Sequence, residues 1–347
     1  MSSVSAVPGI DATAVEDWIC QLDPGASPPF TLTRLGRGKS NVTVLVQDVR
    51  TRRWVLRRPP FGEVAASAHD VMREQSIMSR LIGTCVPVPR VLGATTDRAV
   101  SDAPLVLLEY VNGKTLDGQD AVNVVPLLLR HGLGIALVRA LAAIHNVNLV
   151  AAGLQELASH DRYAPRQIRR WYRQWNAVRT RDAPLVERLA DELLDRAPDE
   201  PEVTLVHGDY HLQNVILDPG WTEVSAVLDW ELSTLGHPLA DLGTLLAYWP
   251  RSANDPVAEL MDLTLPRGFP SDDDLISAYR DASGREVDSV RYWQALGYWK
   301  IAIIGEGVRR RSIDEPLNGE PLPTDLIDAL LERALTLVAS GLCDCSQ

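Results

Sequence analysis

The chain has 347 residues, of which 46% are hydrophobic and 23% charged, and its formal net charge is −12. This length suffices for two domains or one two-lobed domain, and the composition is ordinary for a soluble globular protein. The excess of acidic over basic residues lies in the part of the chain after residue 113, and this negative charge argues against a nucleic-acid partner.

The cysteines and the apolar stretches of the chain predict a cytoplasmic protein. The four cysteines are scattered, which argues against a disulfide framework. Acidic residues from Asp11 onward interrupt any apolar leader near the N-terminus. The most apolar stretch, residues 122–154, contains Pro126 and several charged side chains, so it favours a core helix over a membrane span. We therefore expect no membrane partner.

The N-terminal third of the chain is predicted to be rich in strands. A short helix is expected at residues 11–22, and alternating apolar residues at 30–58 predict a meander of antiparallel strands. A helix is predicted at 68–82, and the Val-Pro-Val-Pro segment at 86–89 prevents it from continuing. Two further strands are expected at 90–95 and 105–111.

The remainder of the chain is predicted to be mainly helical. From about residue 120 the apolar spacing is helical, and only residues 205–230 return to strands. A strand-rich part and a helical part joined near residues 109–115 predict an α+β, two-lobed architecture. We place the N-terminal lobe at 1–110 and the C-terminal lobe at 111–347.

One motif in the second part carries most of the chemical information. His207, Asp209 and Asn214 form the pattern H-x-D-x-x-x-x-N, and Asp229 follows after a short apolar run. This spacing is typical of the catalytic loop and metal-binding aspartate of protein-kinase-like phosphotransferases. Phosphoryl transfer needs a carboxylate near the acceptor hydroxyl and oxygen ligands for Mg²⁺. Asp209 suits the first task, and Asn214 and Asp229 suit the second.

The N-terminal part offers candidate contacts to a nucleotide. A Gly-containing turn between two strands presents backbone N–H groups that suit phosphates. The strand that follows ends in the basic residue Arg57, and the next helix carries Glu74 as its acidic partner. A later strand ends near Glu109, where backbone groups suit hydrogen bonds to a purine base. The predicted nucleotide contacts are Gly36, Gly38, Ser40, Asn41, Arg57, Glu74, Glu109 and Val111.

At this point the chain resembles the aminoglycoside-phosphotransferase-type branch of the protein-kinase-like superfamily. The resemblance rests on His207-Gly208-Asp209 and on the segment Pro238–Gly243. Within this branch the chain is most similar to the acyl-CoA-dehydrogenase-associated phosphotransferase group. The runs that carry this likeness are Lys39-Ser40-Asn41, VLRRPP at 55–60 and AHDVMRE at 68–74. The resemblance covers roughly residues 30–310 and implies the two-lobed kinase fold, with an N-terminal nucleotide-binding lobe.

The resemblance also implies a role for each residue of the motif. Asp209 would orient or deprotonate the acceptor hydroxyl, and Asn214 and Asp229 would hold Mg²⁺. His207 would brace the loop, and Asp241 would steady it from the next helix. ATP is the expected phosphoryl donor, with GTP as the second option.

Two positions depart from the family pattern. Arg57 stands where a lysine is usual, in a chain with only three lysines, and its planar group changes the phosphate geometry. Asp229-Trp230-Glu231 replaces the usual Asp-Phe-Gly, which keeps the metal-binding carboxylate.

The residues that bind the acceptor are predicted with two interpretations left open. In the segment 166–175, Trp171 and Trp175 share one face of a helix that also carries four arginines. Two interpretations stay open: the tryptophans pack the helix while the arginines are solvated, or the arginines bind a phosphorylated or CoA-bearing acceptor. The candidate acceptor residues are Arg166, Arg170, Trp171 and Arg309.

These features together predict a small-molecule kinase that transfers the γ-phosphoryl group of a nucleotide to a hydroxyl. A hydroxyacyl-CoA is one candidate acceptor. The alternatives are an aminoglycoside-type antibiotic phosphotransferase, favoured by the acidic second part, and a catalytically weak nucleotide-binding module, favoured by Arg57 alone. The oligomeric state is not predicted.

Overall fold

The computed structural model describes residues 9–35, 41–60, 70–158, 161–315 and 319–340. The contacts between residues divide the chain into two compact units. The first unit contains the residues up to Asn112 together with Ser225–Glu231, and the second contains Gly113–Val224 and the residues from Leu232 onward. The short segment Ser225–Glu231 thus belongs to a unit that lies more than 100 positions earlier in the sequence.

The first unit is built on a five-stranded antiparallel sheet with the strand order β1-β2-β3-β5-β4. Buried and half-buried residues alternate along β2, as expected for a strand with two different faces. The predicted meander and the two later strands are present, and the last strand ends at Glu109. The strands are β1 (Thr31–Leu35), β2 (Val42–Gln47), β3 (Arg53–Arg58), β4 (Val91–Thr95) and β5 (Leu105–Glu109).

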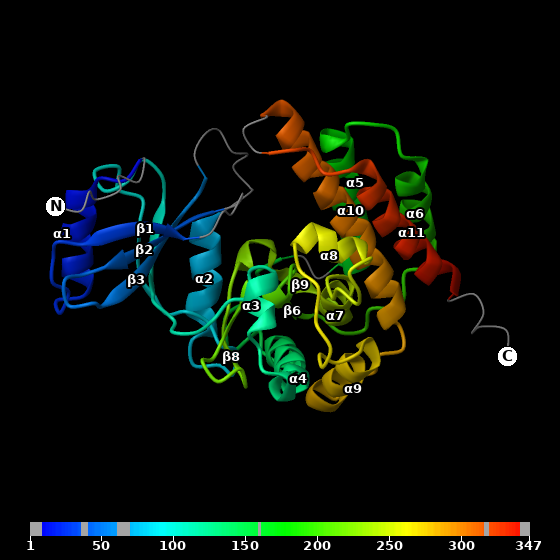
Figure 1. Ribbon diagram of the computed structural model, residues 1–347, viewed down its shortest axis with the longest axis horizontal. Helices are drawn as coiled ribbons and strands as arrows, with labels where there is room; N and C mark the ends of the chain where they lie inside the picture. Colours follow the sequence, from blue (N-terminus) through cyan, green and yellow to red (C-terminus); the bar gives the residue numbers. More distant parts are fainter. Residues whose placement is uncertain (1–8, 36–40, 61–69, 159–160, 316–318, 341–347) are drawn as a thin grey trace. The chain divides into compact units, whose positions relative to one another are not determined.

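Two helices accompany this sheet (Figure 1). Helix α1 (Ala12–Leu22) buries Val15 and Ile19 in a cluster that includes Leu56 of β3. Helix α2 (Val71–Leu81) begins at Asp70, whose carboxylate caps the backbone N–H groups of the first turn, and it contacts β4 and β5. Because successive strand residues point to opposite faces, Arg57 faces away from the cluster that contains Leu56.

The second unit is mainly helical. Its helices are α3 (Gln119–Asn123), α4 (Leu127–His145), α5 (Tyr163–Val178), α6 (Pro184–Asp195), α7 (Leu239–Ala247), α8 (Pro256–Met261), α9 (Asp272–Ser283), α10 (Val290–Asp314) and α11 (Thr324–Ser340). Strand β6 (Thr204–Val206) pairs with β9 (Thr234–Gly236), and β7 (Val215–Leu217) follows the catalytic-loop motif. Strand β8 (Val224–Val227) comes next in the sequence, and all but its first residue belong to the segment Ser225–Glu231 of the first unit.

Helix α10 is the central element of the second unit. It packs against α5, α6, α7 and α11, and Figure 1 shows it running between α5 and α11. Its approach to α7 is close, since a Cβ atom at Gly243 would lie 2.3 Å from a backbone carbon of Trp293. The arrangement buries most of α10, including its one lysine, Lys300.

Helix α4 is the one helix of the described residues that is long and apolar enough to cross a membrane by length and composition. Half of its apolar window is buried within the protein. The buried part includes Leu133, Leu137, Leu141 and Ile144, and the helix contacts α9 and β6. This packing agrees with the core helix that the sequence predicts. The predicted α+β class, with a strand-rich first part and a helical second part, is confirmed.

Candidate functional site

The catalytic-loop motif lies between β6 and β7 in the second unit. Gly208 adopts φ +85°, and a Cβ atom there would lie 2.5 Å from the carbonyl oxygen of Leu232. Only glycine is compatible with both the left-handed backbone and the close approach. The loop ends in a short 3₁₀ turn at Leu212–Asn214. Glycine at the middle of the His-Gly-Asp triplet is therefore explained by the conformation of the loop.

Asp241 holds the start of this loop from the first turn of α7. Its carboxylate accepts hydrogen bonds from the backbone N–H of His207 (2.5 Å) and of Gly208 (2.8 Å). The imidazole Nε2 of His145 lies 3.3 Å from the same carboxylate, which is fully buried. Burial alone would raise the pKa of Asp241, but the hydrogen bonds and the two histidines lower it. Asp241 therefore contacts the loop that the family resemblance expects it to steady, and the steadying role stays a prediction.

His207 contributes to the same loop through its side chain. Its Nδ1 accepts a hydrogen bond from the backbone N–H of Asp209 at 3.3 Å, and its ring lies edge-on to that of Tyr210. The Tyr210 hydroxyl in turn donates to the carbonyl of Leu137 in α4. The loop is thereby tied to the helical core on both sides of Asp209.

Replacing Asp241 with asparagine should destabilise the second unit by about 3 kcal/mol, because one backbone N–H of the loop would face an amide N–H₂ and a buried charge network would lose its anion. Denaturant unfolding measures the loss. Asp191→Asn, the same change on the exposed side of α6, is the control and should leave the free energy of unfolding at the wild-type value. Equal stability of the two variants would contradict the bracing role.

The carboxylate of Asp209 is surrounded by donors from two elements. The Nζ atom of Lys300 lies 3.1 Å from Oδ1, while His211 Nε2 (3.6 Å) and Asn214 Nδ2 (3.4 Å) lie near Oδ2. Burial alone would raise the pKa of Asp209, but Lys300 and His211 outweigh it and hold the pKa well below its usual range. Asp209 is therefore a carboxylate anion at neutral pH.

Asn214 presents its two polar atoms differently. Its Nδ2 lies 2.9 Å from the carbonyl oxygen of Asp209 and 3.1 Å from His211 Nε2. These contacts orient the amide through its nitrogen, and its Oδ1 atom has no hydrogen-bond partner among the described residues. Such a carbonyl oxygen is a suitable ligand for a hard divalent cation.

In the first unit, Arg57 joins two acidic side chains. Its Nη2 lies 3.2 Å from Glu74 Oε2 in α2 and 3.1 Å from Asp229 Oδ1. Glu74 also accepts a hydrogen bond from the backbone N–H of Trp230, and Val227 donates its backbone N–H to Pro87. These contacts explain why the segment Ser225–Glu231 belongs to the first unit. The predicted partnership of Arg57 with Glu74 is present.

This cluster carries more negative than positive charge. Burial, reinforced by the nearby carboxylates of Asp229 and Glu231, raises the pKa of Glu74 to about 7, although Arg57 acts in the opposite direction. The same acids keep Arg57 protonated, since their attraction raises its pKa against the effect of burial. Asp229 adopts φ +65°, a conformation that non-glycine residues rarely take and that occurs at functional sites. An additional cation would relieve the repulsion.

The other predicted nucleotide contacts differ in their burial and in their hydrogen-bond partners. Asn41 is buried, its Nδ2 lies 3.4 Å from Glu231, and its Oδ1 has no hydrogen-bond partner within the described part of the chain. Glu109, the last residue of β5, accepts a hydrogen bond from the backbone N–H of Arg90, and Val111 follows it in the segment after the strand. Gly36, Gly38 and Ser40 lie outside the described residues.

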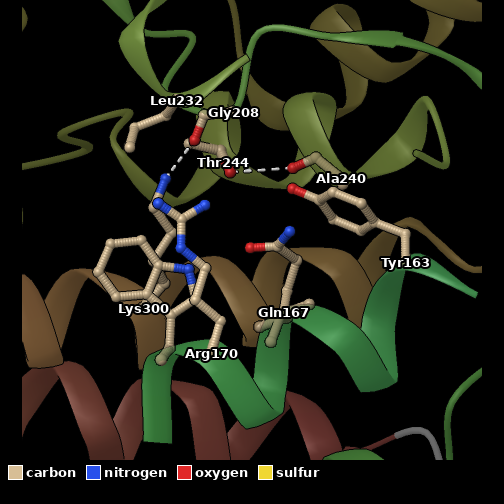
Figure 2. A pocket seen from close by; sticks show the side chains of 10 residues that line it. Tyr163, Gln167, Arg170, Gly208, Leu232, Ala240, Thr244 and Lys300 are labelled. Atoms are coloured by element: carbon tan, nitrogen blue, oxygen red, sulfur yellow. Dashed lines mark hydrogen bonds between the residues drawn. The ribbon is translucent and has the colours of Figure 1, made fainter. Parts of the chain in front are cut away.

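A small pocket opens beside the catalytic loop within the second unit (Figure 2). Water-sized molecules have about 20 Å³ of free space in it, which is room for one or two waters. Figure 2 shows the side chains of Arg170 and Lys300 directed from α5 and α10 toward Gly208. The pocket is lined by Tyr163, Gln167, Arg170, Trp171, Gly208, Leu232, Ala240, Thr244, Leu296 and Lys300.

Two of the four predicted acceptor residues line this pocket, and two do not. Arg170 and Trp171 line it. Arg166 donates instead to the carbonyl of Leu235 at 2.5 Å, and Arg309 donates to Thr180 Oγ1 and to the carbonyl of Leu322. The acceptor role of all four stays a prediction, and the structure places only the first pair at a pocket.

Lys300 is the residue of this site that the sequence interpretation missed. It lies 91 positions from Asp209, so no local motif contains both residues. The available signal was a single lysine inside an apolar helical stretch, since a buried ammonium requires an acidic or carbonyl partner. Among the described residues, no group of three or more His, Cys, Asp and Glu side chains is placed to bind a metal ion.

Known proteins share both the sequence pattern and the fold. Residues 31–283 match the profile of the Phosphotransferase enzyme family. Acyl-CoA dehydrogenase family member 10 of Mus musculus is 34% identical over 288 residues, which are 82% of this chain and 27% of that protein. Acyl-CoA dehydrogenase family member 11 of Pongo abelii is 33% identical over 316 residues, which are 89% of this chain and 40% of that protein.

A solved structure is similar over nearly the whole chain. It is that of a Ralstonia eutropha JMP134 protein provisionally classed as an aminoglycoside phosphotransferase, with 27% identity and a TM-score of 0.76. The superposition covers 95% of this chain and 99% of that one, and it confirms the predicted protein-kinase-like fold. The chain spans less than half the length of the two curated relatives above. With its profile match over residues 31–283, the chain belongs to the phosphotransferase enzyme family, whose members transfer a phosphoryl group to hydroxyl acceptors.

Proposed function

We propose that the chain transfers the γ-phosphoryl group of ATP, with GTP as the second possible donor, to a hydroxyl of a small acceptor. The observation that carries this proposal is the state of Asp209. Its carboxylate is ionised, fixed by Lys300, His211 and Asn214, and placed in a loop whose glycine lines a pocket. An ordered anion beside a pocket suits the orientation of an incoming hydroxyl group.

The task of Asp209 follows from its charge. As an anion it accepts the hydrogen bond of the acceptor hydroxyl and directs a lone pair of that oxygen at the phosphorus atom. A carboxylate with so low a pKa is a weak base, so the proton passes from the hydroxyl to Asp209 only as the new O–P bond forms. In the same step the bond between the γ-phosphorus and the β,γ-bridging oxygen breaks, and the nucleoside diphosphate leaves with that oxygen. Asp209 thus acts first by orientation.

Asn214 and Asp229 are the proposed oxygen donors for Mg²⁺. Asn214 in the second unit has its amide oriented with Oδ1 left for a ligand. Asp229 belongs to a cluster in which Arg57 faces Glu74 and two neighbouring acids, Asp229 and Glu231. Both donors are hard oxygen ligands, and the excess negative charge around Asp229 suits a divalent cation. The bound metal would neutralise the phosphate oxygens during transfer.

The chemistry of the pocket supports an acceptor that presents oxygen atoms. Arg170, Lys300 and Gln167 bring N–H donors to it, and two of these side chains are cations. Such donors favour a carbonyl, carboxylate or phosphate oxygen and disfavour the ammonium groups of an aminoglycoside. The matched regions of the two curated relatives are parts of proteins named for acyl-CoA dehydrogenation. We therefore propose a hydroxyacyl compound, such as a hydroxyacyl-CoA, as the acceptor.

Arg170→Ala should raise the KM of a hydroxyacyl acceptor about tenfold, because a charged hydrogen bond to a substrate oxygen contributes about 1.5 kcal/mol. Arg169→Ala is the matched control, since Arg169 is an exposed neighbour on the same helix that does not line the pocket. Steady-state kinetics at saturating nucleotide measure the difference. Equal acceptor KM values for the two variants would contradict a role of this pocket in acceptor binding.

A panel of acceptors with Mg²⁺ and ATP or GTP tests the function itself. Transfer to a hydroxyacyl-CoA or a free hydroxy acid supports the proposal, and ³¹P NMR of the product identifies the new phosphate ester. Preferential transfer to an aminoglycoside would replace the proposed acceptor while keeping the reaction. Nucleotide binding without transfer to any hydroxyl would overturn the reaction.

A further inference from the structure

Lys300 occupies a position that helix packing alone does not explain. It lies in the middle of α10, between residues that are almost all buried, and its own side chain is 8% exposed. Burying an ammonium group is costly unless it is paired and hydrogen-bonded. A methionine or leucine would fill the same space in this helix without that cost. The contacts of its ammonium group must therefore explain why a lysine is buried at this position.

Those contacts all lie at the catalytic loop and the pocket. The Nζ atom donates to the backbone carbonyl of Gly208 and to Asp209 Oδ1 at 3.1 Å, and it lies 5.6 Å from the ring centroid of Trp171. Figure 2 shows the bond to Gly208 at the edge of the pocket. Gly208 takes its left-handed conformation at the same point. One ammonium group thus fixes both the backbone and the carboxylate of the loop.

The two oxygens of Asp209 are consequently not equivalent. Oδ1 is covered by Lys300, whereas Oδ2 faces the loop's own His211 and Asn214. An ammonium has three N–H donors, and the two bonds use two of them. The third remains for an oxygen atom of a molecule in the pocket, since Lys300 also lines that pocket.

We propose that Lys300 is a positioning residue of the transfer reaction, which fixes Asp209 through Oδ1 and offers its third N–H to an oxygen next to the acceptor's hydroxyl. This inference rests on the proposed phosphotransferase function and deepens it. It assigns the acceptor a second oxygen, such as the carbonyl of a hydroxyacyl group, within reach of the same ammonium that holds the catalytic loop. The ring of Trp171 lies 5.6 Å from that ammonium and lines the same pocket.

Three variants test the role in catalysis. Lys300→Met should lower kcat about 100-fold, since a lost fixed donor at a reacting centre has this order of effect, and leave the nucleotide KM within about twofold. Lys300→Arg keeps the charge and should recover about a tenth of the wild-type kcat. Lys114→Met is the matched control, because Lys114 lies over the ring of Trp221 and should keep the wild-type kcat.

Folding and pairing are measured separately from activity. Rates are expressed per nucleotide-binding site, so that unfolded molecules do not count. In protein labelled with ¹⁵N-lysine, only Lys39, Lys114 and Lys300 give ammonium signals, and a buried ion-paired ammonium exchanges its protons slowly. The slow signal should be absent in Lys300→Met and lost in Asp209→Asn. If the Lys300 ammonium signal keeps its slow proton exchange in Asp209→Asn, the ion pair between Lys300 and Asp209 is contradicted.

The outcomes separate this inference from the function on which it rests. A wild-type chain that transfers phosphate to no hydroxyl overturns both. A wild-type chain that transfers phosphate, with a Lys300→Met variant whose kcat per site stays within about threefold, overturns the role of Lys300 alone. Equal kcat losses in Lys300→Met and Lys300→Arg also overturn it, because a positioning cation is partly replaced by another cation.

Discussion

Replacing Asp209 with alanine should lower kcat about 1,000-fold and leave the affinity for the nucleotide within about threefold of the wild type. The loss follows from the contacts of the carboxylate, which is the one anion that Lys300, His211 and Asn214 jointly orient. Without it, the acceptor hydroxyl has no fixed hydrogen-bond partner at the catalytic loop. Nucleotide affinity should persist because the Arg57 cluster belongs to the other unit.

The measurement requires single-turnover kinetics and a separate nucleotide titration on the same preparation. Asp209→Asn is the matched variant, since it keeps the shape of the side chain and removes its charge. We expect it to lose nearly as much activity as Asp209→Ala, because the asparagine amide can donate toward Lys300 instead of accepting. Wild-type kcat in either variant would remove Asp209 from the mechanism and, with it, the basis of the proposed reaction.

Helix α2 and the pairing of Arg57 with Glu74 show what local sequence can predict. The helix expected at 68–82 is observed at Val71–Leu81, and Asp70 sets its start by capping the first turn. The partnership of Arg57 with Glu74 was also predictable, because the family pattern relates a strand end to the next helix. In both cases the decisive residues lie within a short stretch of the chain.

The residues around the pocket show the limit of the same approach. The segment 166–175 predicted an arginine-rich helix, and the helix is present as part of α5. Which arginine reaches the pocket depends on how α5 packs against α10, and Arg166 and Arg170 differ by one helical turn. Lys300 was missed for the same reason, since its partners come from contacts between helices and a loop 91 positions away. Packing, rather than propensity, determines these positions.

The segment after the catalytic loop shows a further limit. Residues 225–231 follow the loop closely in sequence, yet they belong to the first unit. The cause is a set of long-range contacts: Val227 with Pro87, Asp229 with Arg57, and Trp230 with Glu74. The motif spacing predicted the chemistry of Asp229 as a candidate ligand, and that role stays a prediction.

Replacing Asp229 with alanine should weaken the binding of the Mg²⁺–nucleotide complex about 100-fold and leave the binding of metal-free nucleotide nearly unchanged. The reason lies in the charge of the Arg57 cluster. Removal of Asp229 takes away one of the carboxylates that raise the pKa of Glu74, and Arg57 then pairs with Glu74 alone. The cluster then carries one negative charge fewer, so its attraction for a divalent cation is weaker.

Calorimetric titration with and without Mg²⁺ separates these two affinities in one protein, so the metal-free measurement serves as the internal control. The pH dependence provides a second check. In the wild type, the pKa of Glu74 is raised to about 7, so Glu74 binds a proton more readily in the folded state and stability falls as pH rises from about 4.5 to 7. In Asp229→Ala this slope should be smaller, because the repulsion that raises the pKa is reduced. An unchanged slope together with unchanged Mg²⁺ dependence would show that Asp229 neither binds the metal nor shapes the charge of the cluster.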